Sequence, residues 1–117
     1  MERRDIVARL EEEAARIAAA HDGLANPARV LILAALMALG GEASWSDLKK
    51  ALELVYGEVN PNFLAFHLRR LISSGIVGKA ALEEPRYVLE DEGLAKEVKP
   101  LAEMFRSLLE VRSAEHP

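Results

Sequence analysis

Hydrophobic residues recur at helical spacing along most of the chain. Over residues 1–21 they fall at alternating three- and four-residue steps, which predicts a helix with a single apolar seam that Asp22-Gly23 ends. Residues 28–39 are apolar almost all round, which predicts a helix buried at the centre of a domain. Asn26-Pro27 marks its start, because Asn can accept a hydrogen bond from an exposed amide and Pro at the first helical position needs no acceptor.

A third helix is predicted to begin near Ser46. Both Ser44 and Ser46 can cap it, and we expect Ser46, with Asp47 in the first turn and residues 43–45 left for a short strand or extended link. One face of this helix would carry its apolar side chains, Leu48, Ala51, Leu52 and Val55.

A fourth helix is predicted over residues 60–74. Asn60-Pro61 repeats the cap-and-proline signal, and Gly75 is expected to end the helix. An aromatic ring on its solvent side, Phe66, is unfavourable unless something covers it. At helical spacing the inner face would carry Leu64, Leu68, Leu71 and Ile72, and the opposite face Asn62, Phe66, Arg69 and Ser73, with Phe63 and Arg70 along one edge.

Beyond the fourth helix the apolar spacing changes to that of strands. Residues 76–82 and 86–89 predict a two-stranded hairpin around residues 83–85. Residues 90–111 predict a last helix with a second apolar seam, which Pro100 is expected to bend or interrupt. The predicted fold class is therefore mainly α with a small β-hairpin (α+β).

Charge is unevenly distributed along the chain. Asp and Glu outnumber Lys and Arg 19 to 15, yet residues 59–82 contain no carboxylate, and their charged side chains are Arg69, Arg70 and Lys79. A cationic stretch free of acids in an acidic protein predicts a surface that binds a polyanion. Most arginine pairs are simply solvated, but the long run without acids favours a role at phosphates.

The composition limits the class of protein. With 117 residues, 50% of them apolar, we expect a single domain with a continuous core. The absence of Cys excludes disulfides, thiolate metal sites and thiol nucleophiles. The longest apolar run, residues 30–39, is too short to cross a membrane, and the acidic amphipathic start differs from a signal peptide, so we expect a cytoplasmic protein. The lack of Gln and Thr suggests a thermophilic source.

No pattern typical of catalysis is found in the sequence. There is no glycine-rich phosphate loop, no Ser beside a usable His and no His pair at metal-ligand spacing, so we predict neither an enzyme nor a metal or cofactor. The acidic clusters at residues 11–13 and 90–92 fit helix surfaces and a helix start. An alternative is a metal or proton site between subunits, formed by His21-Asp22 and His116.

The order of the predicted elements, helix, helix, short strand, helix, turn, helix, hairpin and helix, is that of a winged helix-turn-helix with extra N- and C-terminal helices. The segments Leu24–Leu33, Ala43–Leu52 and Phe66–Val77 resemble the signature blocks of the ArsR-like winged-helix transcription regulators, a family common in archaea, and Tyr87–Gly93 resembles the end of their wing. The resemblance implies a DNA-binding core over residues 24–93, a homodimer, and double-stranded DNA as the partner, with the fourth helix in the major groove.

Two features depart from that family. Metal-sensing members carry paired Cys or a His/Asp cluster, whereas this chain has no Cys and three His, which excludes thiolate metal sensing. The wing tip, residues 83–86, contains two Glu where a wing that binds phosphates is usually basic, and this weakens the case for a contact between the wing and DNA.

We predict DNA contacts from three elements. Arginine would bind guanine or phosphate, Asn62 adenine, and Phe66 a thymine methyl. Alternatives remain open, because helix capping would also explain the serines, another element could cover Phe66, and His67 could pack at the helix boundary. The predicted contacts are Ser44, Ser46 and Lys49 on the third helix, Asn60, Asn62, Phe63, Phe66, His67, Arg69 and Arg70 on the fourth, and Lys79 and Arg86 on the hairpin.

The two terminal seams, within residues 1–23 and 94–117, suggest a homodimer. In a two-fold dimer the seams of two subunits would cover each other and present two fourth helices to successive major-groove turns. The alternative is that both helices pack together within one chain. The predicted interface residues are Val7, Leu10, Ala14, Ile17, Leu94, Val98, Leu101, Phe105 and Leu108.

The sequence thus predicts a transcription regulator that binds specific double-stranded DNA, acting as a repressor by occluding a promoter. The alternative is a winged helix used for protein contact, with Phe63 and Phe66 as hydrophobic anchors and little DNA binding. The two functions differ in their response to salt, which weakens binding to DNA but hardly affects an apolar protein interface.

Overall fold

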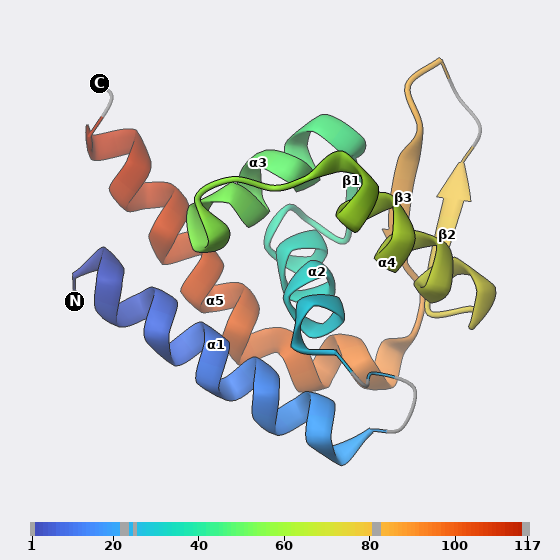
Figure 1. The fold of residues 1–117 in the computed structure, drawn as a ribbon, viewed down its shortest axis with the longest axis horizontal. Coiled ribbons are helices and arrows are strands. Elements are labelled where there is room, and N and C mark those ends of the chain that lie inside the picture. Colours follow the sequence, from blue (N-terminus) through green and yellow to red (C-terminus); the bar gives the residue numbers. More distant parts are fainter. Residues whose placement is uncertain (1, 22–23, 25, 81–82, 116–117) are drawn as a thin grey trace.

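The computed structural model describes residues 2–21, 24, 26–80 and 83–115. Asp22-Gly23, residues 81–82 of the predicted hairpin, and His116 with the site proposed for it lie outside the described residues. The prediction of a mainly helical fold with a small β component is confirmed. In the described part of the chain the elements are α1 (Arg3–Ala20), α2 (Pro27–Ala38), β1 (Glu42–Ser44), α3 (Trp45–Tyr56), α4 (Pro61–Ser73), β2 (Val77–Ala80), β3 (Arg86–Leu89) and α5 (Glu92–Glu115), as Figure 1 shows.

Helix α2 lies at the centre of the fold, where the other helices surround it (Figure 1). Asn26 caps it as predicted, since its side-chain oxygen accepts a 2.8 Å hydrogen bond from the amide of Ala28. Every residue from Val30 to Leu36 is buried. The apolar residues found all round this helix in the sequence therefore correspond to burial on all sides, as predicted.

Helices α1 and α5 lie side by side and both pack on α2 (Figure 1). Their seams form part of the chain's own core. This corrects the assignment of the seams to a dimer interface, because the chain itself covers nearly all of their side chains. Val7 is half-buried against the core, and the other residues of the predicted interface are buried within one chain: Leu10, Ala14, Ile17, Leu94, Val98, Leu101, Phe105 and Leu108.

Pro100 does not interrupt α5, which runs as one helix from Glu92 to Glu115. A proline in a helix lacks the amide that would bond to the carbonyl four residues earlier, and this lost bond was the basis of the prediction. Pro100 is exposed, whereas Val98 and Leu101 on either side of it are buried. The buried side chains on either side of Pro100 therefore pack in the core while the helix continues through the proline.

Helix α3 begins at Trp45, one residue after β1 ends, and its cap is Ser44 instead of Ser46. The Ser44 hydroxyl accepts a 3.1 Å hydrogen bond from the amide of Asp47. Ser44 is the last paired residue of β1, opposite Arg86 of β3. The extended backbone of the strand end thus supplies the conformation that a cap residue needs.

The sheet has three antiparallel strands in the order β1-β3-β2. The predicted hairpin is present as β2 and β3, with Lys79 opposite Tyr87. The extended link before α3 is the third strand, β1, which places Ala43 opposite Tyr87 on the other side of β3. The sheet therefore joins the start of α3 to the segment that follows α4, and this connection positions the two helices relative to each other.

Candidate nucleic-acid interface

Helix α4 is anchored by its inner face and its start. Leu64, Leu68 and Leu71 are buried in the core, as predicted. The Asn60 side chain accepts a 2.8 Å hydrogen bond from the amide of Asn62 and so caps the helix. Three leucines and a cap therefore anchor the helix, and its opposite side faces the solvent.

We call that opposite side the outer face of α4 and define it by five exposed residues, Asn62, Phe63, Phe66, Arg69 and Arg70. Phe66 is 44% exposed and Phe63 37%, both high values for phenylalanine in a folded protein. All five were predicted DNA contacts, and the structure brings them together on one surface without a carboxylate from α4 itself. In the described part of the chain the exposed large hydrophobic side chains are Phe63 and Phe66 of this face and Tyr56.

An aromatic cluster extends across the outer face. The ring centres of Phe63 and Phe66 lie 4.6 and 5.3 Å from that of His67, and both contacts are edge-on. Tyr56 at the end of α3 meets Phe63 edge-on at 6.1 Å. The guanidinium carbon of Arg70 lies 5.5 Å from the centre of the Phe66 ring. These contacts restrict the rings and place a cation beside Phe66.

His67 lies beneath this cluster and is only 3% exposed, which corrects its assignment as a DNA contact. Its Nδ1 accepts a 3.1 Å hydrogen bond from Nε of Arg29 on α2. Burial lowers the pKa of the His67 imidazole, and the neighbouring Arg29 cation lowers it further. His67 is therefore a neutral acceptor that ties α4 to α2, in line with the packing role that the sequence left open.

The predicted contacts at the start of α3 are less available than expected. Ser44 is 5% exposed and its hydroxyl is occupied as the helix cap, so its assignment to phosphate binding is corrected. Lys49 forms an ion pair with Glu53, one turn later, with Nζ and Oε2 3.1 Å apart. Ser46 is exposed. Of these three predicted contacts, Ser46 alone is exposed, and its hydroxyl does not cap the helix.

The hairpin contributes little positive charge. Arg86 lies 3.7 Å from a carboxylate oxygen of Glu42 on β1, and the Lys79 ammonium lies 5.9 Å from the ring centre of Tyr87. Glu83 and Glu84 at the tip are exposed. The acidic tip and the ion pair of Arg86 are both unfavourable for a contact between this hairpin and DNA, as the two Glu in the sequence of the tip already indicated.

Two side chains that contact residues of α4 in or beneath this face were not found from the sequence. Tyr56, 39% exposed, comes seven residues before Phe63 on a different helix, so no single helical pattern includes both. Arg29 is 38 residues away from His67 in the chain, and only the packing of α2 on α4 brings the two side chains together.

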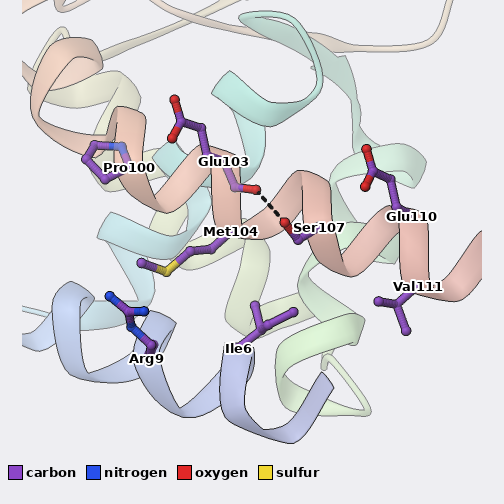
Figure 2. A pocket seen from close by; sticks show the side chains of 8 residues that line it. All are labelled: Ile6, Arg9, Pro100, Glu103, Met104, Ser107, Glu110 and Val111. Carbon is purple, nitrogen blue, oxygen red and sulfur yellow. Dashed lines mark hydrogen bonds between the residues drawn. The ribbon is translucent and has the colours of Figure 1, made fainter. Parts of the chain in front are cut away.

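A concave surface lies between α1 and α5 (Figure 2), and we call it the α1–α5 groove. Its volume is about 600 Å³. Ile6 and Arg9 project from α1 and Met104 from α5 into the space between the helices, while the carboxylates of Glu103 and Glu110 lie at the far edge of α5 (Figure 2). The groove thus has an apolar floor with opposite charges on its two sides.

Within the described residues, no three His, Cys, Asp or Glu side chains are grouped so that they could hold a metal ion. Among the described helices, none combines the length and the apolar character needed to span a membrane. Comparisons with protein-family models, curated proteins and solved structures found no match to this chain.

Proposed function

We propose that this protein is a homodimeric winged-helix regulator that binds double-stranded DNA through the outer face of α4. The order of α3, a short turn, α4 and the β2–β3 hairpin supports this interpretation, because it is the order of a helix-turn-helix followed by a wing. In this proposal α4 is the recognition helix, and the protein represses transcription by occluding a promoter.

One observation carries the proposal: the outer face of α4 exposes two adjacent arginines in a stretch of 24 residues, 59–82, without a carboxylate, although the protein carries a net charge of −4. A duplex is a dense line of negative charge, and its binding depends on cations that are not neutralised nearby. The exposed Arg69 and Arg70 provide such cations, and Asn62 provides a side chain that can pair with the edge of adenine.

The α1–α5 groove is the surface that we propose for the second copy. In a two-fold contact the same groove faces itself, so Arg9 of each copy meets Glu103 and Glu110 of the other while the apolar floors cover each other. Sedimentation should then give twice the 12.9 kDa mass of the chain. Met104→Glu should prevent dimerisation, so that only the monomer sediments. Ala15→Glu, at an exposed position that does not line the groove, should leave the dimer intact.

Salt dependence tests DNA binding directly. The affinity of the wild-type protein for a duplex should fall steeply between about 50 and 200 mM salt. In the double variant Arg69→Ala/Arg70→Ala the affinity should fall, and the slope of log affinity against log salt should flatten by about one to two units. The matched control, Arg16→Ala/Arg112→Ala, removes the same charge from α1 and α5 and should keep a slope close to that of the wild type. Undiminished binding by the α4 variant would refute this surface.

A second candidate function is protein contact through the same face. The exposed rings of Tyr56, Phe63 and Phe66 favour it, because aromatic side chains are typical anchors of protein interfaces. The acidic tip of the hairpin is also unfavourable for DNA. Such binding would require Phe63 and Phe66, would tolerate loss of Arg69 and Arg70, and would change little with salt.

A further inference from the structure

Phe66 is restrained on two sides although it is exposed. One side of the ring meets His67 edge-on at 5.3 Å, and the Arg70 guanidinium lies 5.5 Å from the ring centre. His67 is in turn held by the hydrogen bond from Arg29. The ring is nevertheless 44% exposed, so a restrained apolar edge faces the solvent.

Phe66 and Arg70 are one helical turn apart, four residues along α4, and therefore lie on the same ridge of the outer face. Their separation of 5.5 Å is less than two base steps of about 3.4 Å each. If α4 lies in the major groove, one side chain of this pair is within reach of one base pair and the other is within reach of its neighbour.

We propose that Phe66 and Arg70 act together to read a pyrimidine that carries a C5-methyl group beside a guanine. This inference rests on the DNA-binding function proposed above. Phenylalanine has no hydrogen-bonding group, and the apolar group that a base pair presents in the major groove is the C5-methyl of thymine. Arginine most often binds O6 and N7 of guanine. The shared chemistry is the methyl group, which thymine and 5-methylcytosine both supply.

Phe63 provides a matched control for Phe66. It is exposed to a similar extent and also meets His67 edge-on, at 4.6 Å, but its other aromatic contact is Tyr56, and no cation contact to its ring is found in the described part of the chain. Arg69 provides the control for Arg70, because it is exposed on the same face without the Phe66 contact.

The test uses a duplex enriched from a random-sequence pool by the wild-type protein, resynthesised with deoxyuridine in place of each thymine in turn. Removing the contacted methyl should weaken binding about three- to five-fold at one position, next to a guanine. Phe66→Ala should abolish that difference, Phe66→Leu should keep part of it, and Phe63→Ala should keep all of it. Arg70→Ala should reduce discrimination at the neighbouring guanine about ten-fold, and Arg69→Ala should not.

A further arm distinguishes the two sources of the methyl group. At the same position, cytosine with guanine opposite should bind more weakly than thymine, and 5-methylcytosine should recover the three- to five-fold difference if the methyl is what Phe66 reads. Recovery with thymine alone would assign the recognition to the thymine base and overturn the shared-methyl inference.

The failure of this inference is separable from the failure of the proposed function. If no duplex is enriched and binding does not depend on salt, DNA binding itself is refuted. If a duplex is enriched but deoxyuridine has no effect at any position, or has the same effect on Phe66→Ala as on the wild type, DNA binding stands and the role of Phe66 is refuted. Unchanged circular dichroism and thermal midpoints of the variants exclude unfolding as the cause.

Discussion

Helices α5 and α4 both carry phenylalanine, but in opposite environments. Phe105 of α5 is fully buried in the core, whereas Phe63 and Phe66 of α4 are exposed, and Phe66 lies beside Arg70. Both helices have an apolar stripe in the sequence, and in both the structure buries that stripe within the chain. The comparison shows that the regular stripe identifies the core, whereas an apolar residue on the opposite side of the helix identifies a surface that another molecule can cover.

The largest difference in unfolding free energy is expected between alanine variants of the buried and the exposed phenylalanine. Phe105→Ala should cost about 3–5 kcal/mol of unfolding free energy, because it leaves a cavity in the core. Phe66→Ala should change it by less than about 0.5 kcal/mol, since the ring lies at the surface and its removal leaves no cavity in the core. Urea denaturation at one protein concentration measures both. Similar losses for the two variants would mean that another part of the protein covers Phe66 in solution.

The two serines near the start of α3 give a smaller contrast. Ser44→Ala should lower the unfolding free energy by about 1 kcal/mol, because the amide of Asp47 loses the hydroxyl that accepts its hydrogen bond at the start of the helix. Ser46→Ala should have almost no effect on stability. The same denaturation experiment separates them, and a larger loss for Ser46→Ala would show that the helix begins later than Trp45.

The burial of His67, with the Arg29 cation beside it, should make stability depend on pH. The pKa of His67 is lower in the folded state than in the unfolded state, so the unfolded state binds the proton more readily. The stability that neutral His67 contributes is therefore fully present above the unfolded-state pKa of about 6.5. It is lost as the pH falls through the folded-state pKa. His67→Gln has no titrating group and should show a flatter pH dependence of the urea midpoint than the wild type.

His21→Gln serves as a control for this experiment, because His21 contacts Glu97 of α5 and its replacement leaves the contact between Arg29 and His67 intact. It should retain the His67 contribution to the pH dependence. Parallel curves for the wild type and His67→Gln would contradict the buried neutral state of His67.

The smallest effect is expected at Arg86. Its ion pair with Glu42 joins partly exposed side chains, so Arg86→Ala should cost less than about 1 kcal/mol of unfolding free energy. Because the carboxylate already offsets its charge, the variant should also lose much less duplex affinity than Arg70→Ala. Equal losses in a binding titration would show that the hairpin contributes to DNA binding as much as the outer face of α4.

Much of the fold could be predicted because local signals produced it. The Asn26 and Asn60 caps, the burial of α2 and the hairpin all follow from residues close together in the chain. The outer face of α4 could also be predicted, since the period of one helix determines which side chains oppose the buried leucines.

Other features could not be predicted because they depend on distant parts of the chain. The choice of Ser44 over Ser46 as the cap follows from the pairing of β1 with β3. The continuity of α5 through Pro100 depends on the packing of its buried neighbours, and packing free energy can exceed the cost of one missing hydrogen bond.

The sequence by itself determined which residues form helices, which of their sides are apolar, and where the chain lacks acids, because helical period and charge are properties of the order of residues. Only the tertiary structure decided what covers each apolar side. The seams of α1 and α5 cover each other and α2 within one chain, Arg29 reaches His67, and Phe66 stays exposed beside Arg70. These outcomes depend on how separate helices meet in space, and burial is favourable whichever chain supplies the cover.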